Sequence, residues 1–360
     1  MLALVLLHSP VSAGSEPPAV SAASAVVMHP ASGTVLFALH EDEPRLIAST
    51  TKLMTALTAS ELLDPDAEAE ILPQWTGVEG SSMYLHSGES CLVRELLEGL
   101  LLASGNDAAL ALAGITAGDP AEFVALMNEK CRELGLFNTH FDNPHGLDSP
   151  THRSTARDIA LLMAAALKDP LLREIMGMKT CAVRGAVYEN HNQLLRTCPG
   201  VFAGKTGYTK AAGRCLVSAC SRDGMELICV TLSDPDDWRD HASLYDWAYA
   251  AFREIAVPAG VEMARCPVIS GAKDSAGLVS GEEIKLCIPA EAHVHFRLTA
   301  APFVLAPAER GEIAGCAELL VDGRPAGRID LRLAEDVVGR SRGAFLLRDA
   351  ADRLLGIYAV

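Results

Sequence analysis

The sequence is short of basic residues. Lys and Arg number 30 against 46 Asp and Glu, which gives a formal net charge of −16 at pH 7. Because nucleic-acid binding needs a basic face that neutralises phosphates, this balance argues against nucleic acid as a partner. A small anionic substrate stays open, since it responds only to the local field of its site. Nearly half of the 360 residues are apolar, enough for a large core and two domains.

Metal-binding patterns are also missing. No Cys-x-x-Cys occurs, and no Cys/His spacing suits zinc, so we expect no metal site. Three cysteines stand in apolar, strand-like runs, where cysteine commonly serves as a small buried hydrophobe. We interpret the cysteines as mostly buried thiols, with one or two disulfides as the alternative. The ten are Cys91, Cys131, Cys181, Cys198, Cys215, Cys220, Cys229, Cys266, Cys287 and Cys316.

Long hydrophobic runs are absent beyond the N-terminus. Residues 1–7 are apolar but too short to span a bilayer. Val11-Ser12-Ala13 follows, a small-residue pattern that suits signal peptidase, although a basic n-region is lacking. We predict a signal peptide over residues 1–13 and an exported protein; the alternative is a buried N-terminal strand. No other segment is expected to cross a membrane.

The pattern over residues 20–256 predicts one domain that contains both helices and strands. Two hairpins flank it, one around the turn signal Pro30–Gly33 and one around Arg222-Asp223-Gly224. Between them the pattern is mainly helical. Strands at both ends with helices between predict an α/β fold with one antiparallel sheet covered by helices. The helices are expected over 49–63, 92–102, 107–117, 120–134 and 155–166, with a closing helix over 244–252.

Two further segments follow. From 257 to 339 the chain has short strands, prolines and glycines without a convincing helix, which predicts a small all-β domain. Over 340–360 an apolar face predicts a terminal helix. It is either a membrane-surface anchor or a helix packed on its own domain. The residues of this face are Leu347, Ala351, Leu354, Leu355 and Tyr358.

Three short motifs carry the chemistry. Ser49-Thr50-Thr51-Lys52 places an amine beside a hydroxyl, because residues three apart share a helix face. Alone, this pattern also describes a helix N-cap followed by a solvated lysine. Ser104-Gly105-Asn106 and Lys205-Thr206-Gly207 follow in that order. Alone, they are typical of a polar turn and a strand end, but the set of three in order favours an active site.

This set resembles penicillin-binding proteins and class A β-lactamases. The chain is identified as similar to the D-alanyl-D-alanine carboxypeptidases among the low-molecular-mass penicillin-binding proteins. The resemblance runs from about residue 23 to residue 252 and continues more weakly over 305–315. The stretches that carry it are Glu98–Ala109, Leu134–Leu147 and Pro199–Thr209.

The resemblance and the chemistry together assign roles. Ser49 is expected to attack a peptide carbonyl, with Lys52 as its base after burial and nearby positive charge lower the lysine pKa. Ser104 would relay a proton to the leaving D-alanine. Asn106 would hold the substrate's amide backbone, and Lys205 would attract its terminal carboxylate.

The same resemblance extends to the strand after Lys205. Thr206 would add a hydroxyl to the carboxylate site. The backbone N–H groups of Ser49 and Tyr208 would form the oxyanion hole. No metal or organic cofactor is required. We do not expect His145 or His152 to act as a base, because Ser/Lys chemistry does not need histidine.

The leading prediction is a serine-type carboxypeptidase that removes the last D-alanine from peptidoglycan pentapeptides through an acyl-enzyme on Ser49. β-Lactams would acylate the same serine and be released slowly. Its expected location is extracytoplasmic, in the cell wall or on the outer face of the cytoplasmic membrane. One alternative is a β-lactamase, but no Glu-x-x-Leu-Asn loop is present; the corresponding stretch is Phe141–His145. The other is a penicillin-binding or cell-wall-binding module without productive turnover.

Overall fold

The structure is a computed structural model that describes residues 16–340. Contacts divide this part of the chain into two compact units, one ending at Ala251 and the next beginning at Phe252. The domain boundary expected from the sequence, 256/257, lies at the other end of strand β10 (Phe252–Val257). The signal peptide predicted over 1–13, and all of the predicted terminal helix except Arg340, lie outside the described residues.

A five-stranded antiparallel sheet with the order β2-β1-β9-β8-β7 forms the frame of the first unit. The predicted hairpin between β8 and β9 turns at Asp223-Gly224. Both residues have positive φ, 50° and 86°, as a two-residue hairpin turn requires. The strands are β1 (Ser24–His29), β2 (Thr34–Leu39), β7 (Val201–Thr209), β8 (Gly213–Arg222) and β9 (Met225–Leu232).

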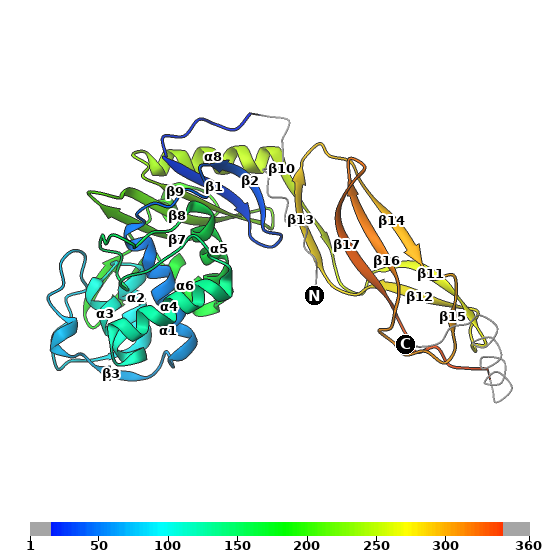
Figure 1. Cartoon of the computed structure of the whole chain (residues 1–360), viewed down its shortest axis with the longest axis horizontal. Helices are drawn as coiled ribbons and strands as arrows, with labels where there is room; N and C mark the ends of the chain where they lie inside the picture. The colour runs from blue at the N-terminus through cyan, green and yellow to red at the C-terminus, as the bar shows by residue number, and fades with distance from the viewer. Residues whose placement is uncertain (1–15, 341–360) are drawn as a thin grey trace. The chain divides into compact units, whose positions relative to one another are not determined.

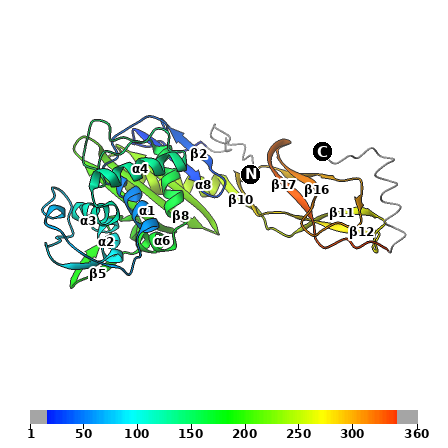
Figure 2. The ribbon, with the colours of Figure 1, turned by 60° about the horizontal axis from the view of Figure 1, so that its bottom comes forward.

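Helices cover both faces of this sheet, which confirms the predicted fold class (Figures 1 and 2). α8 packs on β8 and β9 from one side, and α5 packs on β1 and β9 from the other. Figure 2 shows α1 in the middle of the helical group, and it contacts each of α2 to α6. The α-helices are α1 (Lys52–Leu62), α2 (Val93–Leu101), α3 (Asn106–Ala117), α4 (Pro120–Leu134), α5 (Ala156–Ala166), α6 (Pro170–Gly177), α7 (Leu194–Thr197) and α8 (Asp237–Ala251).

Local signals set several helix ends. Asp119 caps α4 by accepting a hydrogen bond from Ala121 N, and Pro120 occupies the first turn. The helix ends at Gly135, whose φ of 72° is the left-handed conformation that a glycine C-cap supplies. Thr155 caps α5 in the same way through the N–H of Asp158.

The structure differs from the sequence prediction in two places. The closing helix, which was expected to begin at Leu244, begins at Asp237. Its first residues were missed because Asp237, Asp240 and His241 are polar although they are buried. A hairpin of β5 (Thr180–Val183) and β6 (Ala186–Glu189) was not predicted. Its residues are mostly exposed, so they show no apolar alternation. Four short elements complete this unit: η1 (Ala48–Thr51), η2 (Pro73–Trp75), β3 (Glu68–Glu70) and β4 (Ser90–Leu92).

The second unit, over residues 252–340, contains strands and no helix. β10 pairs with β13, and a six-stranded sheet has the order β14-β16-β17-β12-β11-β15. Its core includes the buried residues Cys266, Leu278, Ala317, Ile329 and Leu331. The strands are β11 (Glu262–Ile269), β12 (Ser275–Ser280), β13 (Ile284–Pro289), β14 (Val294–Ala300), β15 (Val304–Leu305), β16 (Ile313–Val321) and β17 (Arg324–Leu333).

Among residues 16–340, no single helix has the length and apolar character needed to span a membrane. Only α3 and α4 meet the length and composition criteria together, and they meet at 86°.

Candidate active site

Ser49 and Lys52 lie on consecutive turns of helical backbone beside the sheet. Ser49 belongs to the 3-10 helix η1 (Ala48–Thr51), and Lys52 is the first residue of α1. Lys52 Nζ lies 2.9 Å from Ser49 Oγ. The spacing of three residues therefore brings the amine to the hydroxyl, as the sequence indicated.

The amine of Lys52 is fully buried and has three polar neighbours. Besides Ser49 Oγ, it contacts Asn106 Oδ1 and the carbonyl oxygen of His145, each at 2.7 Å. Those two oxygens can only accept hydrogen bonds. A neutral amine, which has two N–H groups and one lone pair, satisfies both of them and directs its lone pair at the Ser49 hydroxyl.

Two effects favour that neutral amine. Burial lowers the pKa of Lys52 well below its usual range, and the positive charge of Lys205 lowers it further. The Asp107 carboxylate acts in the opposite direction and is the weaker influence. These effects favour an unprotonated lysine beside the serine hydroxyl, which is the form that a general base requires.

A second serine–lysine pair lies beside the first. Ser104 stands between α2 and α3 in a left-handed conformation, φ 59°. Lys205 Nζ, from β7, donates to Ser104 Oγ at 3.0 Å and to the Thr206 carbonyl at 2.7 Å. Burial lowers the pKa of Lys205 to about 7. Lys205 can therefore gain or lose a proton near neutral pH.

A cavity of about 530 Å³ opens in front of these pairs. Ser49, Ser104, Thr206 and Tyr208 line it, whereas Lys52, Asn106 and Lys205 are buried behind it. Its other lining residues are Ser81, Glu189, Asn190, His191, Gln193, Arg196, Gly207, Arg214, Asp237 and Trp238.

Both ends of the Asn106 amide are engaged within the protein. Its Oδ1 accepts from Lys52, and its Nδ2 donates to the carbonyl of Glu79 at 2.5 Å. In this structure Asn106 therefore positions the Lys52 amine. The contact with substrate expected from the sequence stays a prediction.

β7 approaches the nucleophile closely at a glycine. A Cβ on Gly207 would lie 2.9 Å from the backbone nitrogen of Ser49 and 3.0 Å from the Ile47 carbonyl. Glycine thus allows η1 and β7 to touch. This contact brings the backbone of Ser49 beside that of Gly207 and Tyr208, where the oxyanion hole was expected.

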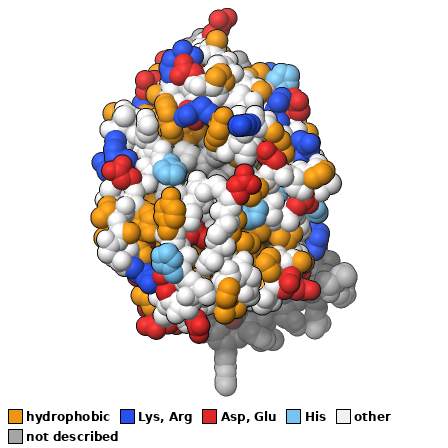
Figure 3. All heavy atoms as spheres, turned by 90° about the vertical axis from the view of Figure 1, so that its left-hand side faces the viewer, with side chains coloured by type: hydrophobic (Ala, Val, Ile, Leu, Met, Phe, Trp, Pro, Cys, Tyr) orange, Lys and Arg blue, Asp and Glu red, His pale blue; other side chains and the backbone are white. Residues whose placement is uncertain are grey.

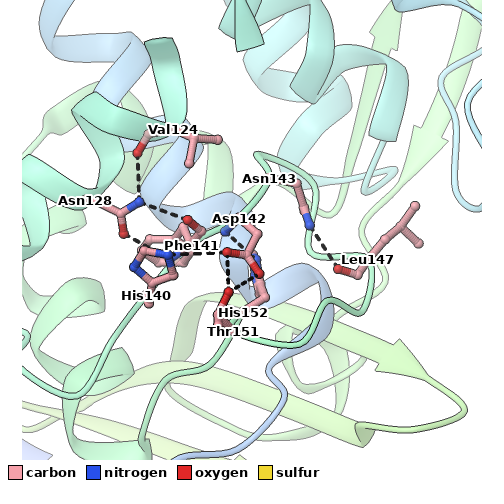
Figure 4. Close-up of polar contacts among 9 residues, drawn as sticks. All are labelled: Val124, Asn128, His140, Phe141, Asp142, Asn143, Leu147, Thr151 and His152. Atoms are coloured by element: carbon pink, nitrogen blue, oxygen red, sulfur yellow. Dashed lines mark hydrogen bonds and ion pairs between the residues drawn. The ribbon is translucent and has the colours of Figure 1, made fainter. Parts of the chain in front are cut away.

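The loop 140–152 places the carbonyl of His145 against Lys52. Figure 4 shows hydrogen bonds that hold this loop. Asn128, from α4, binds the backbone of Phe141 at both N–H and C=O, 3.0 and 2.9 Å. Asn143 closes the turn, with Nδ2 on the Leu147 carbonyl at 3.0 Å. Burial, with Lys52 and His152 nearby, lowers the pKa of His145 to about 4. His145 thus contributes through its backbone.

Several lining residues were not singled out from the sequence. Arg214 stacks over Trp238 at 5.1 Å and donates to Asp237 at 2.7 Å. The one feature of the sequence that could have pointed to Arg214 is its position at the start of β8, the strand that pairs with the strand of Lys205. Glu189 is the last residue of the unpredicted hairpin and His191 follows it, so nothing in the sequence pointed to them. Within residues 16–340, no three His, Cys, Asp or Glu side chains gather as metal ligands.

The fold and site define a class of protein, a serine acyl-transfer enzyme on a helix-covered antiparallel sheet, with a buried lysine amine beside the serine. The sequence matches the model of the D-alanyl-D-alanine carboxypeptidase family over residues 11–236. The chain belongs to this family, as its motifs indicated. It is accordingly a serine-type D-Ala-D-Ala carboxypeptidase.

Individual relatives cover nearly the whole chain. The D-alanyl-D-alanine carboxypeptidase DacC of Escherichia coli is 33% identical, covering 89% of this chain and 86% of its own length. DacF of Bacillus subtilis is 30% identical, with 92% and 90% covered. The crystal structure of penicillin binding protein 5 from Haemophilus influenzae aligns with a TM-score of 0.79 at 30% identity. That alignment covers 90% of this chain and 100% of the other.

Proposed function

We propose that this enzyme removes the terminal D-alanine from peptidoglycan stem pentapeptides through an acyl-enzyme on Ser49. The observation that carries the proposal is the buried Lys52 amine, 2.9 Å from Ser49 Oγ and held by two acceptors. Those acceptors leave its lone pair for the serine proton.

In acylation, Ser49 Oγ bonds to the carbonyl carbon of the penultimate residue while its proton moves to Lys52 Nζ. The backbone N–H groups of Ser49 and Tyr208 stabilise the developing oxyanion, and such a donor contributes about 3 kcal/mol to transition-state stabilisation. As the C–N bond breaks, Ser104 gives its proton to the leaving amine. Ser104 recovers a proton from Lys205, 3.0 Å away.

Deacylation reverses these transfers. Water attacks the ester carbonyl, and its proton passes through Ser104 to Lys205. The proton on Lys52 returns to Ser49 Oγ as the ester C–O bond breaks. A Lys205 pKa of about 7 suits both its loss and its recovery of a proton.

The terminal carboxylate of the substrate defines a carboxypeptidase. The hydroxyl of Thr206 lies on the cavity wall, and the charge of Lys205 lies directly behind it. Arg214 lines the same cavity. Lys205 supplies the positive charge and Thr206 a donor that a free carboxylate requires, whereas the charge of Arg214 is paired with Asp237 and its guanidinium can add only further N–H donors.

The β-lactamase alternative would require a deacylating glutamate in the loop that contains Asp142 and Asp148, and the contacts of this loop do not support it. Its carboxylates are engaged elsewhere: Asp142 accepts from the Thr151 hydroxyl at 2.7 Å, and Asp148 accepts from Thr209 at 2.8 Å. Neither lines the cavity. β-Lactams are therefore expected to acylate Ser49 and to be released slowly.

The setting of the enzyme is part of the proposal. Its family acts on peptidoglycan, which implies a location outside the cytoplasm. We propose export by the signal peptide at 1–13, a catalytic domain over 20–256 and a β domain over 257–339. We further propose peripheral membrane contact through the terminal helix at 340–360.

Release of D-alanine from diacetyl-L-Lys-D-Ala-D-Ala tests the function. Wild type should release D-alanine and bind fluorescent penicillin covalently, and Ser49→Ala should do neither. Wild type that binds penicillin without releasing D-alanine would support the binding-module alternative. Full release by Ser49→Ala would refute the mechanism, and rapid steady-state hydrolysis of penicillin would support the β-lactamase alternative.

A further inference from the structure

A second cavity, of about 950 Å³, adjoins the one that contains Ser49. The two share Ser81, Glu189 and His191, so they form one continuous groove. The face of the first unit seen in Figure 3 is hollowed, with acidic and histidine side chains at the rim. One wall of the second cavity is the segment 80–86, and the other is the β5–β6 hairpin.

The two walls of this second cavity are tied to each other. Tyr188 OH, from the hairpin, donates to the Met83 carbonyl at 2.7 Å. Arg184 forms an ion pair of 2.6 Å with Glu89 across the groove. This pair neutralises the one guanidinium among the residues that line the second cavity. These contacts fix the two walls relative to each other.

Glu189 is different, because its charge is not neutralised. It is exposed, and among residues 16–340 no Lys or Arg nitrogen lies within ion-pair distance of its carboxylate. Burial lowers the pKa of the neighbouring His191, and the charge of Lys205 lowers it further, which favours the neutral ring. Arg196 donates to the carbonyl of Lys179 at 2.7 Å.

The proposed reaction fixes the direction of the peptide. Thr206 and Arg214 mark the carboxylate end of the Ser49 cavity, so the acyl part of the substrate extends the opposite way. Glu189 and His191 line that other part and lead into the second cavity. The residue that precedes D-Ala-D-Ala in a stem peptide is a diamino acid, whose side chain carries an ammonium.

We propose that Glu189 binds the side-chain ammonium of that diamino acid and that the second cavity holds the rest of the stem peptide. This inference rests on the proposed function. The diamino acid is one residue, about 3.5 Å of extended chain, from the acylated residue. A lysine-like side chain adds several ångströms, so its ammonium reaches the wall of the cavity in which Ser49 is acylated.

Two peptides that differ in one charge test the proposal. Nα-acetyl-L-Lys-D-Ala-D-Ala keeps the side-chain ammonium, and the Nα,Nε-diacetyl peptide lacks it. Because an exposed ion pair contributes modestly, wild type should cleave the charged peptide with a kcat/KM about three- to fivefold higher. This preference should shrink as salt is added, since exposed pairs are screened.

Glu189→Gln should bring the ratio of the two kcat/KM values to about one, because the variant has no charge with which to distinguish the two peptides. Glu70→Gln is the matched control: Glu70 is an exposed glutamate outside both cavities, and its variant should keep the wild-type ratio. A wild-type ratio of one, or an unchanged ratio in Glu189→Gln, overturns the assignment while the proposed function stands. If wild type cleaves neither peptide, the proposed function is refuted, and this inference is refuted with it.

Discussion

Thr51 Oγ1 and His152 Nε2 lie 2.7 Å apart in the interior of the first unit. The Thr51 hydroxyl donates to the Ala48 carbonyl at 2.8 Å, so it accepts from Nε2–H. The Asp142 N–H donates to Nδ1 at 3.1 Å. These partners require the neutral tautomer with its proton on Nε2. His152 thereby joins the turn that carries Ser49 to the loop that carries His145.

This arrangement predicts acid sensitivity that depends on His152. Burial lowers the pKa of His152 to about 4, below the value of 6.5 in the unfolded chain. The unfolded state therefore binds the proton first, and stability falls as pH decreases from 6.5 toward 4. The two pKa values imply about 3 kcal/mol for this residue. Glutamine cannot be protonated in this range, so the stability of His152→Gln should fall by about 3 kcal/mol less than that of wild type as the pH decreases from 6.5 toward 4.

Urea unfolding of both proteins at pH 7 and near pH 4 measures the difference. His145 and His241, whose pKa values are lowered to about 4 and about 3, should keep part of the acid dependence in the variant. His152→Ala serves as a comparison. It leaves the Asp142 N–H without its acceptor and should lower the free energy of unfolding at both pH values. Equal pH dependence in wild type and His152→Gln would contradict this account.

The sequence revealed the local part of the site. Ser49 and Lys52 are three residues apart, so helix geometry alone predicts their contact. The turn at Asp223-Gly224 likewise needs only its own chemistry. The pairing of Ser104 with Lys205, 101 residues apart, depends on the tertiary fold, which brings the turn between α2 and α3 to β7, and no local pattern indicates it.

Other features could not be read from local pattern. The β5–β6 hairpin is exposed on most positions, so no apolar alternation marks it. The start of α8 buries Asp237 and His241, which a reading based on hydrophobicity places at the surface. The full burial of Lys205 also escaped prediction, because a charged residue type does not show where tertiary packing covers it.

Lys52→Arg tests the requirement for a neutral amine. Arginine keeps a positive charge at this position but does not lose its proton, so it cannot accept the proton of Ser49. The acylation rate with fluorescent penicillin should fall by about 10²- to 10⁴-fold, the usual contribution of a general base. Circular dichroism should show a folded protein. An acylation rate within about threefold of wild type would rule out Lys52 as the base.

The two lysines predict a bell-shaped pH dependence of kcat/KM. Activity should fall on the acid side as Lys52 takes up a proton, because its base form is lost. It should fall on the alkaline side above about 7, where Lys205 loses the proton that it supplies. Measurement from about pH 5 to pH 10 with the diacetyl peptide gives both limbs.

Lys205→Arg separates the two limbs. Its guanidinium stays protonated throughout this range, so the alkaline limb should disappear while the acid limb remains. The plateau should be lower, because arginine cannot exchange a proton with Ser104. An alkaline limb that persists unchanged in this variant would assign that limb to another group.

Two glycines with nearly the same φ allow the cost of backbone strain to be measured apart from the cost of a steric clash near the site. Gly146 and Gly185 have φ of 90° and 83°, where any other residue is strained. A Cβ on Gly146 would lie 2.0 Å from the Ala48 carbonyl oxygen, beside Ser49. A Cβ on Gly185 would meet no atom within 4 Å. Gly185→Ala should therefore lose only about 1 kcal/mol, the cost of the positive φ.

Gly146→Ala adds the backbone clash to the same strain. The loop must move away from η1, which would displace the His145 carbonyl from Lys52. We expect a loss of stability of about 3 kcal/mol or more, together with a fall in acylation rate that Gly185→Ala does not show. Thermal unfolding and penicillin acylation measure the two effects. Equal losses in both variants would mean that the loop and η1 are not in close contact.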